Sequence, residues 1–293
     1  MKNGFLGINQ GINFQVPYQK ARAVVIPFGL ENTVSYGHGT KKGPRAIIEA
    51  SHYAEILDEQ ILKPFAKCGI ATLKEPSIPK DQKIAIGILA DAVKQVIADN
   101  KFPLVLGGEH SLTQGTVKGL CSKYKNFTVL HFDAHSDTRT TYYLGSVFSH
   151  GAVMSQVLEK YPVAKLVQVG IRSVSDQDGE WNFRQKNKKR IETFWAWENI
   201  RPADVVKAIP TRDVFISFDV DAFDPAVIPA TGTPEPGGLL WWPTLEILKT
   251  IFAKKNVIGA DIVELAPEKG LHHPDFTVAK LAYKMIGYKF FGK

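Results

Sequence analysis

Three side chains that commonly bind metal ions follow a short apolar segment near the middle of the sequence. Residues 129–137 read V-L-H-F-D-A-H-S-D, which places Asp133, His135 and Asp137 two residues apart. Side chains alternate between the faces of an extended segment, so these three would point to one side, with neighbours roughly 6.6 Å apart. Crowded carboxylates and imidazoles repel one another or lose solvation unless a cation lies between them. By itself, the segment is equally consistent with a solvated strand end whose polar groups cap the next helix.

Two other segments have the same organisation. Residues 214–225 form an apolar strand that ends in Asp219 and Asp221, and residues 104–113 run through a glycine pair to His110. In parallel α/β sheets, ligands bind beyond the carboxyl ends of the strands. Two histidines and four aspartates delivered to one edge are difficult to explain by packing alone. The three segments together therefore predict a metal site.

The composition is that of a globular protein. The 293 residues are 44% apolar and 22% charged, and a chain of this length can bury a large core. No apolar segment approaches the roughly 20 residues that span a bilayer, and residues 1–6 do not resemble a secretory signal. Cys68 and Cys121 lie far apart and outside any C-x-x-C motif, which favours a reducing compartment and argues against thiolate metal ligands. We therefore expect a cytoplasmic protein without a membrane segment.

The net charge of +7 makes nucleic acid a partner to consider. The densest basic segment, residues 184–190, reads R-Q-K-N-K-K-R and is typical of a solvated helix end or loop. The other lysines are scattered, whereas an electrostatic binding surface requires clustered charge. We therefore expect no nucleic-acid partner.

Predicted strands alternate with predicted helices along the chain. Apolar segments of strand length occur at 22–28, 102–106, 127–132, 165–169, 191–194, 213–218 and 257–263. Helices are predicted at 80–100, 112–122, 150–160, 176–190, 202–209, 242–252 and 275–288, and one more starts near Pro44 and continues through 46–60. Such alternation implies right-handed crossovers and a parallel sheet. We predict an α/β fold with three α-β-α layers, a mainly parallel central sheet and one domain spanning residues 1–293.

The metal-site segments resemble the signature motifs of the ureohydrolase family, in the same order. The motifs are G-G-E-H-S at 107–111, D-A-H-S-D at 133–137 and S-F-D-V-D-A-F-D-P at 217–225, with further matches in T-G-T-P-E-P-G-G-L at 231–239 and D-I-V-E-L-A-P at 261–267. The resemblance covers about residues 25–290 and departs within the motifs at Glu109, where many relatives have aspartate. The family includes arginases and agmatinases and hydrolyses guanidino compounds to urea and an amine. The resemblance implies an arginase-like fold and this reaction class.

The resemblance also assigns six residues to two metal ions. One ion would be held by His110, Asp133, Asp137 and Asp219, and the other by His135, Asp133, Asp219 and Asp221. Asp133 and Asp219 would then bridge ions roughly 3.5–4 Å apart, with a hydroxide between them. An oxygen-rich donor set with imidazole and no sulfur suits Mn²⁺ better than a structural zinc. We expect two Mn²⁺ ions per chain, although nickel, cobalt or iron would also accept these donors.

Asp137, His150 and Glu264 are expected to act on the substrate. Two divalent ions balance the four aspartates, and a hydroxide leaves a net charge of about −1, which favours a small cationic guanidino substrate. Glu264 matches the glutamate with which relatives hold the guanidinium, and Asp137 would carry a proton to the leaving amine. His150, in S-H-G-A-V-M, matches a histidine that moves protons at the mouth of the site. A surface carboxylate at 264 and a helix-start histidine at 150 are the alternatives.

Two departures from the arginase pattern indicate a different substrate. Arginases bind the amino-acid end of arginine partly through polar residues at the positions that are Arg139 and Ser175 here. The segments S-H-G-A-V-M and T-P-E-P-G-G-L look more like agmatinases. The expected reaction is therefore agmatine to putrescine and urea, a step of polyamine biosynthesis.

Several alternatives stay open. Arg139 could instead bind the carboxylate of a guanidino acid such as 4-guanidinobutyrate, and arginase activity is a further alternative. The complete ligand set disfavours a catalytically silent binding protein and a single-zinc deacetylase of related fold. The resemblance also implies a homo-oligomer, either a trimer or a hexamer.

Overall fold

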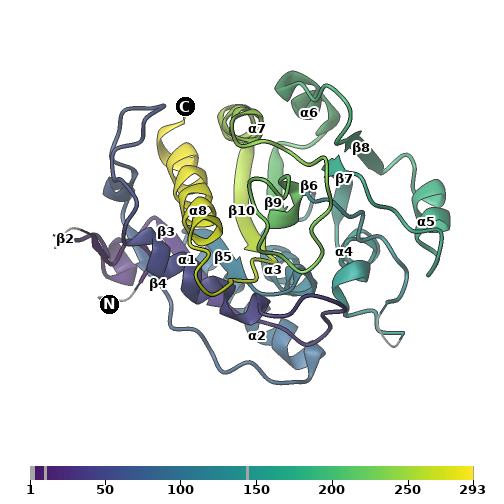
Figure 1. Ribbon diagram of the computed structural model, residues 1–293, viewed down its shortest axis with the longest axis horizontal. Coiled ribbons are helices and arrows are strands. Elements are labelled where there is room, and N and C mark those ends of the chain that lie inside the picture. Colours follow the sequence, from purple (N-terminus) through teal and green to yellow (C-terminus); the bar gives the residue numbers. More distant parts are fainter. Residues whose placement is uncertain (1–3, 10–11, 143–144, 293) are drawn as a thin grey trace.

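A central eight-stranded sheet organises the computed structural model (Figure 1), which describes residues 4–9, 12–142 and 145–292. The strand order is β4-β3-β5-β10-β9-β6-β7-β8, and every neighbouring pair is parallel. The strands are β3 (Ala23–Phe28), β4 (Ile70–Thr72), β5 (Phe102–Gly107), β6 (Phe127–Phe132), β7 (Val163–Ile171), β8 (Ile191–Trp195), β9 (Asp213–Asp219) and β10 (Asn256–Val263). A separate antiparallel pair near the N-terminus comprises β1 (Ile8–Asn9) and β2 (Ile12–Asn13).

Helices cover both faces of this sheet. Their bounds are α1 (Gly43–Ser51), α2 (Gln82–Ala98), α3 (Thr113–Leu120), α4 (Val153–Lys160), α5 (Glu180–Lys186), α6 (Pro202–Ala208), α7 (Trp241–Lys254) and α8 (His273–Phe291). Apolar side chains of α1, α6, α7 and α8 join one buried core, and those of α2, α3, α4 and α5 join a second core. The strands separate the two cores, since Val25 belongs to the first and its neighbours Val24 and Ile26 belong to the second. The predicted three-layer α/β fold is confirmed.

Burial on both faces explains the apolar composition of the strands. Every residue of β3, β5 and β6 is buried, and a strand covered on both sides has no solvent face that could carry polar residues. Thr128 and His131 are exceptions within β6, because both are polar and fully buried. Buried polar groups need hydrogen-bond partners, and both of these residues have them.

The four central strands bring the predicted site residues to one edge. β10 and β9 lie between β5 and β6, and all four are parallel, so their carboxyl ends meet. His110 follows β5, Asp133 follows β6, Asp219 ends β9 and Glu264 follows β10. A contact between the His110 amide and Glu264 joins residues that are 154 positions apart in sequence.

The helix predicted through residues 46–60 is shorter than expected, because α1 ends at Ser51. The segment that follows contains helix-forming residues but is held by α8. Lys284 of α8 is fully buried, and its Nζ lies 2.6 Å from Asp58 Oδ2 and 2.9 Å from Glu59 Oε1. These ion pairs fix the segment in a non-helical path.

The helix predicted at 176–190 is limited to α5, and its preceding residues form a loop. Asp178 and Gly179 have left-handed backbone angles, with φ of 51° and 72°. A left-handed residue interrupts a right-handed helix, so α5 begins at Glu180. β4 was not predicted, since its three residues are too few for a clear pattern.

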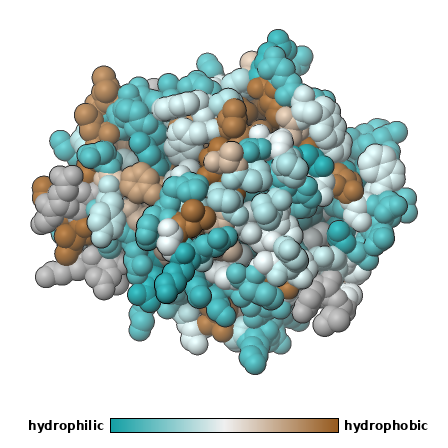
Figure 2. Space-filling view, viewed as in Figure 1, coloured by the Kyte–Doolittle hydropathy of each residue, from teal (hydrophilic) through white to brown (hydrophobic). Residues whose placement is uncertain are grey.

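Among the described residues, no helix is long and apolar enough to cross a bilayer. Hydrophilic residues predominate on the face shown in Figure 2, with apolar residues in small separate groups.

Candidate metal centre

The loop after β5 places His110 at the carboxyl edge of the sheet. Gly108 lies so close to the Leu30 carbonyl that a Cβ atom would be 2.0 Å from its oxygen, so only glycine fits. The chain then enters a 3-10 helix, η4 (His110–Leu112), and the His110 side chain is 1% exposed. The glycine pair of the motif therefore lets the chain turn tightly at the site.

The segment after β6 is not the extended strand that the alternation argument assumed. β6 ends at Phe132, and Asp137 has a left-handed backbone with φ of 51°, which aspartate tolerates better than most residues. His135 N donates to Asp133 Oδ1 at 2.6 Å. Turns, rather than strand alternation, bring the three side chains of this motif together.

The end of β9 fixes one oxygen of each of two carboxylates. Asp219 Oδ1 accepts a hydrogen bond from Asp221 N at 2.9 Å, within the turn into the 3-10 helix η6 (Val220–Ala222). Asp221 Oδ1 accepts one from Ala134 N at 3.0 Å. The Oδ2 atom of each aspartate is left to face a histidine.

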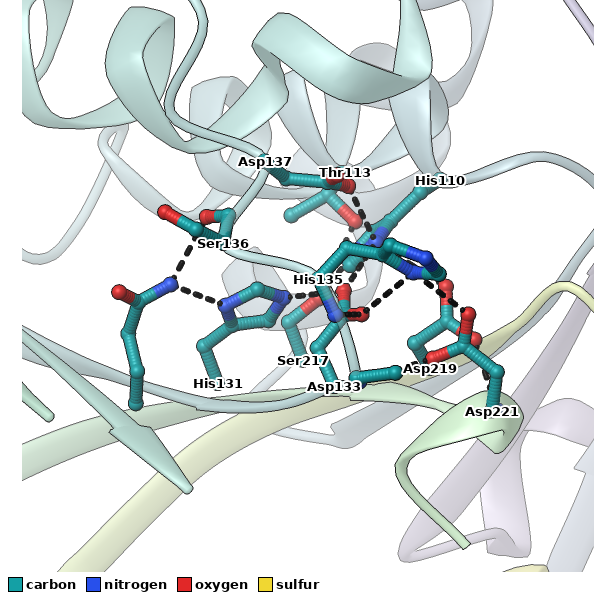
Figure 3. A network of polar contacts seen from close by, with 12 residues as sticks. His110, Thr113, His131, Asp133, His135, Ser136, Asp137, Ser217, Asp219 and Asp221 are labelled. Carbon is teal, nitrogen blue, oxygen red and sulfur yellow. Dashed lines mark hydrogen bonds and ion pairs between the residues drawn. The ribbon is translucent and has the colours of Figure 1, made fainter. Parts of the chain in front are cut away.

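Three carboxylates surround one nitrogen of His110 (Figure 3). His110 Nδ1 lies 3.2 Å from Asp133 Oδ2, 3.1 Å from Asp137 Oδ2 and 3.3 Å from Asp219 Oδ2. Nevertheless, this buried nitrogen has no hydrogen-bond partner within the described residues. An imidazole nitrogen facing three carboxylate oxygens is the donor set of a divalent cation.

The outer contacts of His110 determine its tautomer. Its Nε2 lies 2.9 Å from Ser217 Oγ, and Ser217 donates its own proton to Asp261 Oδ1 at 2.7 Å. Ser217 therefore accepts from His110, so Nε2 carries the proton of the neutral ring, and Nδ1 of that ring presents the lone pair that a metal ion requires. Burial disfavours the charged ring, but the proximity of Asp133, Asp137 and Asp219 outweighs burial and raises the pKa of His110 well above its usual range. Without a metal the ring therefore takes up a second proton among these oxygens, and a metal ion would take the place of that proton. The residues present thus fit a metal ion.

His135 and Asp221 form a second cluster that shares Asp133 with the first. His135 Nδ1 lies 2.9 Å from Asp221 Oδ2 and 3.6 Å from Asp133 Oδ1. Asp133 therefore faces His110 with Oδ2 and His135 with Oδ1, as a bridging carboxylate would. The bridging role of Asp219 toward the second cluster stays a prediction.

Burial and mutual repulsion raise the pKa values of two of these carboxyl groups. Burial, followed by the proximity of Asp221 and Asp133, raises the pKa of Asp219 well above its usual range. Burial and then Asp133 raise the pKa of Asp221. A nearby divalent cation stabilises the charged forms and offsets both effects.

A cavity of about 580 Å³ opens onto the two clusters. Its wall includes His135, Asp137, His150, Asp219, Asp221 and Glu264. His110 and Asp133 are more deeply buried, at 1% and 0% exposed. Every residue that the sequence singled out for the site therefore lies at one place in the structure, while their individual roles stay predictions.

Glu264 reaches the cavity with one carboxylate oxygen free. It follows β10 in a left-handed conformation, with φ of 67°, and its Oε1 accepts from His110 N at 2.6 Å. No described residue donates a hydrogen bond to Oε2. Burial, and next the proximity of Glu109, raise the pKa of Glu264 well above its usual range. A cation bound beside Oε2 would restore the charged form.

His150 stands at the start of the 3-10 helix η5 (His150–Ala152), with its ring centroid 5.1 Å from that of Tyr142. Its Nδ1 makes a long contact of 3.4 Å to Thr33 Oγ1, whose hydroxyl donates to Glu109 at 2.8 Å. Thr33 therefore accepts from Nδ1–H, which leaves Nε2 to exchange protons. Burial lowers the pKa of His150, although Asp137 and Glu109 oppose this shift.

Comparison with known proteins identifies the family. The model of the arginase family matches residues 21–287. The chain belongs to the arginase family. The N(1)-aminopropylagmatine ureohydrolase of Synechocystis sp. is 36% identical over 288 residues, with 92% of this chain and 90% of the relative covered. The agmatinase of Pyrococcus horikoshii is 34% identical over 278 residues, with 93% of each covered. The solved structure of the agmatine ureohydrolase of Thermoplasma volcanium has a TM-score of 0.86 at 29% identity, with 99% of this chain and 94% of that chain covered.

Within this arginase-family site, Arg139 already has an anionic partner. Its Nη1 lies 2.8 Å from Asp178 Oδ2, and its guanidinium carbon is 4.2 Å from the centroid of the Tyr142 ring. Arg139 and Ser175 both belong to the cavity wall. Because the charge of Arg139 is paired, it is a weak anchor for a substrate carboxylate.

Four buried polar residues near the centre were not assigned a role from the sequence: Glu109, His131, Ser217 and Asp261. Glu109 Oε2 accepts from the backbone amides of Asn32 and Thr33, at 2.8 and 2.6 Å, and so fixes a loop beside the site. Three of the four interrupt apolar strands. A polar residue within an otherwise apolar strand could have indicated these residues in the sequence, because a buried polar group needs a hydrogen-bond partner.

Proposed function

We propose that this arginase-family protein hydrolyses a linear guanidino compound to urea and an amine, with agmatine as the substrate and putrescine as the amine. The observation that carries the proposal is the free oxygen of Glu264 beside two histidine–aspartate clusters that share Asp133. The names of the relatives from Pyrococcus horikoshii and Thermoplasma volcanium, both of which refer to agmatine, support it.

We propose Mn²⁺ as the metal, with two ions per chain. His110, Asp133, Asp137 and Asp219 would hold one ion, and His135, Asp133, Asp219 and Asp221 would hold the other. These donors are rich in carboxylate and contain no sulfur, which suits Mn²⁺. When bound, the two metal ions lower the pKa of a water molecule and so supply the nucleophile.

The chain's own residues bind the substrate and move protons. Glu264 holds the guanidinium at Oε2 and orients its carbon toward the clusters. As oxygen from water bonds to this carbon, the C–N bond to the tail breaks. Asp137 takes a proton from the water and passes it to the departing nitrogen, and the second water proton follows when the C=O bond of urea forms, so the amine departs with both protons. His150 exchanges protons with the solvent through Nε2, and urea and a protonated amine leave.

A longer polycationic guanidine is the second candidate substrate. Relatives named N(1)-aminopropylagmatine ureohydrolase, from Synechocystis sp. and Thermus thermophilus, are 36% and 34% identical to this chain. Asp176 belongs to the cavity wall, is exposed, and makes no hydrogen bond or ion pair with another described residue. Its free carboxylate could attract an additional ammonium group in the tail.

A urea-release assay with Mn²⁺-loaded protein tests the proposal. The substrates are agmatine, N(1)-aminopropylagmatine, arginine and 4-guanidinobutyrate at equal concentrations. We expect the fastest release from agmatine, and faster release from the aminopropyl compound would establish the second candidate. No urea from any of the four compounds would refute the proposed reaction.

We also propose that the chain forms a homo-oligomer, either a trimer or a hexamer. The segment after α1 exposes three large apolar side chains, Tyr53, Leu57 and Leu62, at 81%, 56% and 71%. Large apolar side chains left exposed within one short segment are candidates for a subunit interface. Light scattering should give three or six times the chain mass of 32.5 kDa, whereas the mass of one chain would contradict the proposal.

A cytoplasmic location is proposed from the two free cysteines, Cys68 and Cys121. Free thiols persist in reducing compartments. Fractionation of the source cells should place the protein in the cytoplasm, and recovery from an oxidising compartment would contradict this.

A further inference from the structure

His131 lies beside the metal centre but has no part in the reaction proposed above. It precedes Asp133 by two residues and is fully buried within β6. Its Nε2 lies 2.7 Å from Asp133 Oδ2, and its ring centroid is 5.1 Å from that of His110 (Figure 3). It is therefore close enough to bind a metal ion together with His110 and Asp133. The question is whether His131 is a ligand or supports a ligand.

The partner of the other ring nitrogen decides between these roles. Gln168 is paired with His131 in the register of β6 and β7, and its Nε2 lies 3.0 Å from His131 Nδ1. The same Nε2 lies 2.8 Å from the Ser136 carbonyl oxygen, and Gln168 Oε1 lies 2.6 Å from Arg184 Nη1. A carbonyl only accepts and a guanidinium only donates, so the orientation of the Gln168 amide is fixed.

Arg184 is itself held firmly at the end of this network. It is the first residue of the basic segment 184–190, which was predicted to be solvated, but its side chain is buried. Its Nη1 also lies 2.6 Å from Ser136 Oγ, and its Nη2 lies 2.8 Å from Thr193 Oγ1. These contacts restrain the arginine and, through it, the glutamine.

Because Gln168 donates to His131 Nδ1, that nitrogen must be an unprotonated acceptor, and Nε2 must carry the ring proton. A protonated Nε2 cannot bind a metal, and Nδ1 is occupied by Gln168. We propose that His131 is a positioning residue, a neutral Nε2–H donor that holds Asp133 Oδ2 in the orientation required by the metal centre. The inference rests on the proposed metal role of Asp133.

Two substitutions separate the hydrogen bond from the volume of the ring. His131→Phe fills a similar space without a donor, whereas His131→Gln keeps an N–H group near the position of Nε2. Loss of a hydrogen bond to a metal ligand commonly weakens metal binding about 10–100-fold. We expect this loss of Mn²⁺ affinity for the phenylalanine variant, while the glutamine variant should retain most of the wild-type affinity.

A buried position at the opposite end of the same strand supplies the control. Thr128 Oγ1 lies 2.8 Å from Thr211 Oγ1 and is also fully buried. Thr128→Val should leave the Mn²⁺ affinity unchanged. Mn²⁺ titration calorimetry on chelator-stripped proteins gives the affinities, and circular dichroism of the same samples shows whether each variant is folded.

The outcomes separate the possible roles. Wild-type Mn²⁺ affinity in His131→Phe would overturn the inference. An equal loss of affinity in His131→Gln would also overturn it, because it would indicate that His131 is a direct ligand. An equal loss in Thr128→Val would overturn it as well, because it would indicate general destabilisation. Absence of Mn²⁺ binding by the wild-type protein would refute the proposed metal centre itself. Wild-type binding together with an unaffected phenylalanine variant would refute only the role of His131.

The tautomer can be observed without mutating the network. Ring ¹⁵N spectra of histidine-labelled protein loaded with diamagnetic Zn²⁺ should show an unprotonated Nδ1 and a protonated Nε2 for His131, with the His131→Gln spectrum supplying the assignment. A proton on Nδ1 would overturn the inference even if the phenylalanine variant failed to fold.

Discussion

Asp133 connects more of the centre than any other single ligand described above. Its Oδ2 contacts His131 and faces His110, while its Oδ1 contacts the His135 amide and faces the ring of the same residue. One carboxylate thus links three histidines and both proposed metal positions. A change at any of these neighbours should therefore be visible in metal binding before it is visible in the fold.

Asp219→Asn is expected to abolish activity by removing a ligand charge while preserving the shape of the side chain. We expect fewer than two Mn²⁺ ions per chain and a rate at least about 10²-fold lower. The raised pKa of Asp219 means that its charged form destabilises the metal-free fold at neutral pH. The metal-free variant should therefore unfold at the same temperature as the wild type or higher. Elemental analysis, urea release and thermal unfolding check these points, and two ions with full activity would contradict them.

His150→Ala should slow urea release about 10²-fold, as is typical for loss of a general acid–base group, with unchanged Mn²⁺ content. Burial lowers the pKa of His150, so the ring is neutral and can accept a proton at neutral and alkaline pH. Tyr142→Phe is the matched control, because it keeps the ring that packs against His150. Rates equal to the wild type from pH 6 to 9 would show that the histidine is only structural.

The residues proposed as metal ligands could be singled out from sequence because each lies in a short motif at or just after the end of an apolar strand. His131 could not be assigned in this way. Its partner Gln168 lies on another strand, and only the parallel register of β6 and β7 brings the two residues together. Spacing within a motif is a local property, whereas register between strands is not.

At the level of elements, Glu109 links the loop after β5 to the segment that follows β3. Its side chain is fully buried and accepts from Asn32 N, Thr33 N and Thr33 Oγ1. It also accepts from Gln82 and Ser111. Thr33 in turn contacts His150, so Glu109 helps to fix the position of the proposed proton carrier.

Glu109→Gln should destabilise the protein, because an amide NH₂ would replace one oxygen that accepts hydrogen bonds. An unsatisfied buried polar group costs about 1–3 kcal/mol in the free energy of unfolding. Urea denaturation monitored by circular dichroism measures the change. Glu49→Gln is the control, since Glu49 is 59% exposed and pairs with Arg45 at the surface, where a loss of about 0.5 kcal/mol or less is expected. Equal stability of the two variants would contradict this account.

The ends of helices cannot always be predicted from the local sequence. Residues 52–60 contain helix formers, but Lys284, more than 220 positions later, draws Asp58 and Glu59 toward α8. A prediction from composition cannot include a contact of this range. By contrast, α2 was predicted within about two residues at each end, because its apolar spacing is regular and Asp81 caps it through Ile84 N.

At the scale of the whole molecule, alternation of strands and helices predicted the parallel sheet but not its strand order. The insertion of β10 between β5 and β9 is what places Glu264 against the His110 amide. The far part of the cavity wall is built from other segments, around Tyr36, Arg139, Asp176 and Gly232. In the proposed reaction, the guanidinium end of the substrate and its tail would therefore be recognised by different parts of the chain.

Because different parts of the chain would bind the two ends of the substrate, we predict a preference for agmatine over arginine. The ratio of kcat/KM should be about a hundredfold, which corresponds to about 2.7 kcal/mol of activation free energy. Both substrates offer the same guanidinium to Glu264, but arginine adds a carboxylate to the tail. That carboxylate would meet the free Asp176 and an Arg139 already paired with Asp178, so its desolvation would not be compensated. Steady-state kinetics on both substrates measure the ratio.

Arg139→Gln, assayed with agmatine, arginine and 4-guanidinobutyrate, tests the alternative that Arg139 binds the carboxylate of a guanidino acid. If Arg139 only pairs with Asp178, the variant should keep the order of substrates, with agmatine first. Equal or better turnover of arginine by the wild type would contradict the prediction. A wild-type preference for 4-guanidinobutyrate that disappears in Arg139→Gln but persists in Asp178→Asn would instead make Arg139 a carboxylate anchor, because a guanidinium binds a carboxylate through charge-assisted hydrogen bonds.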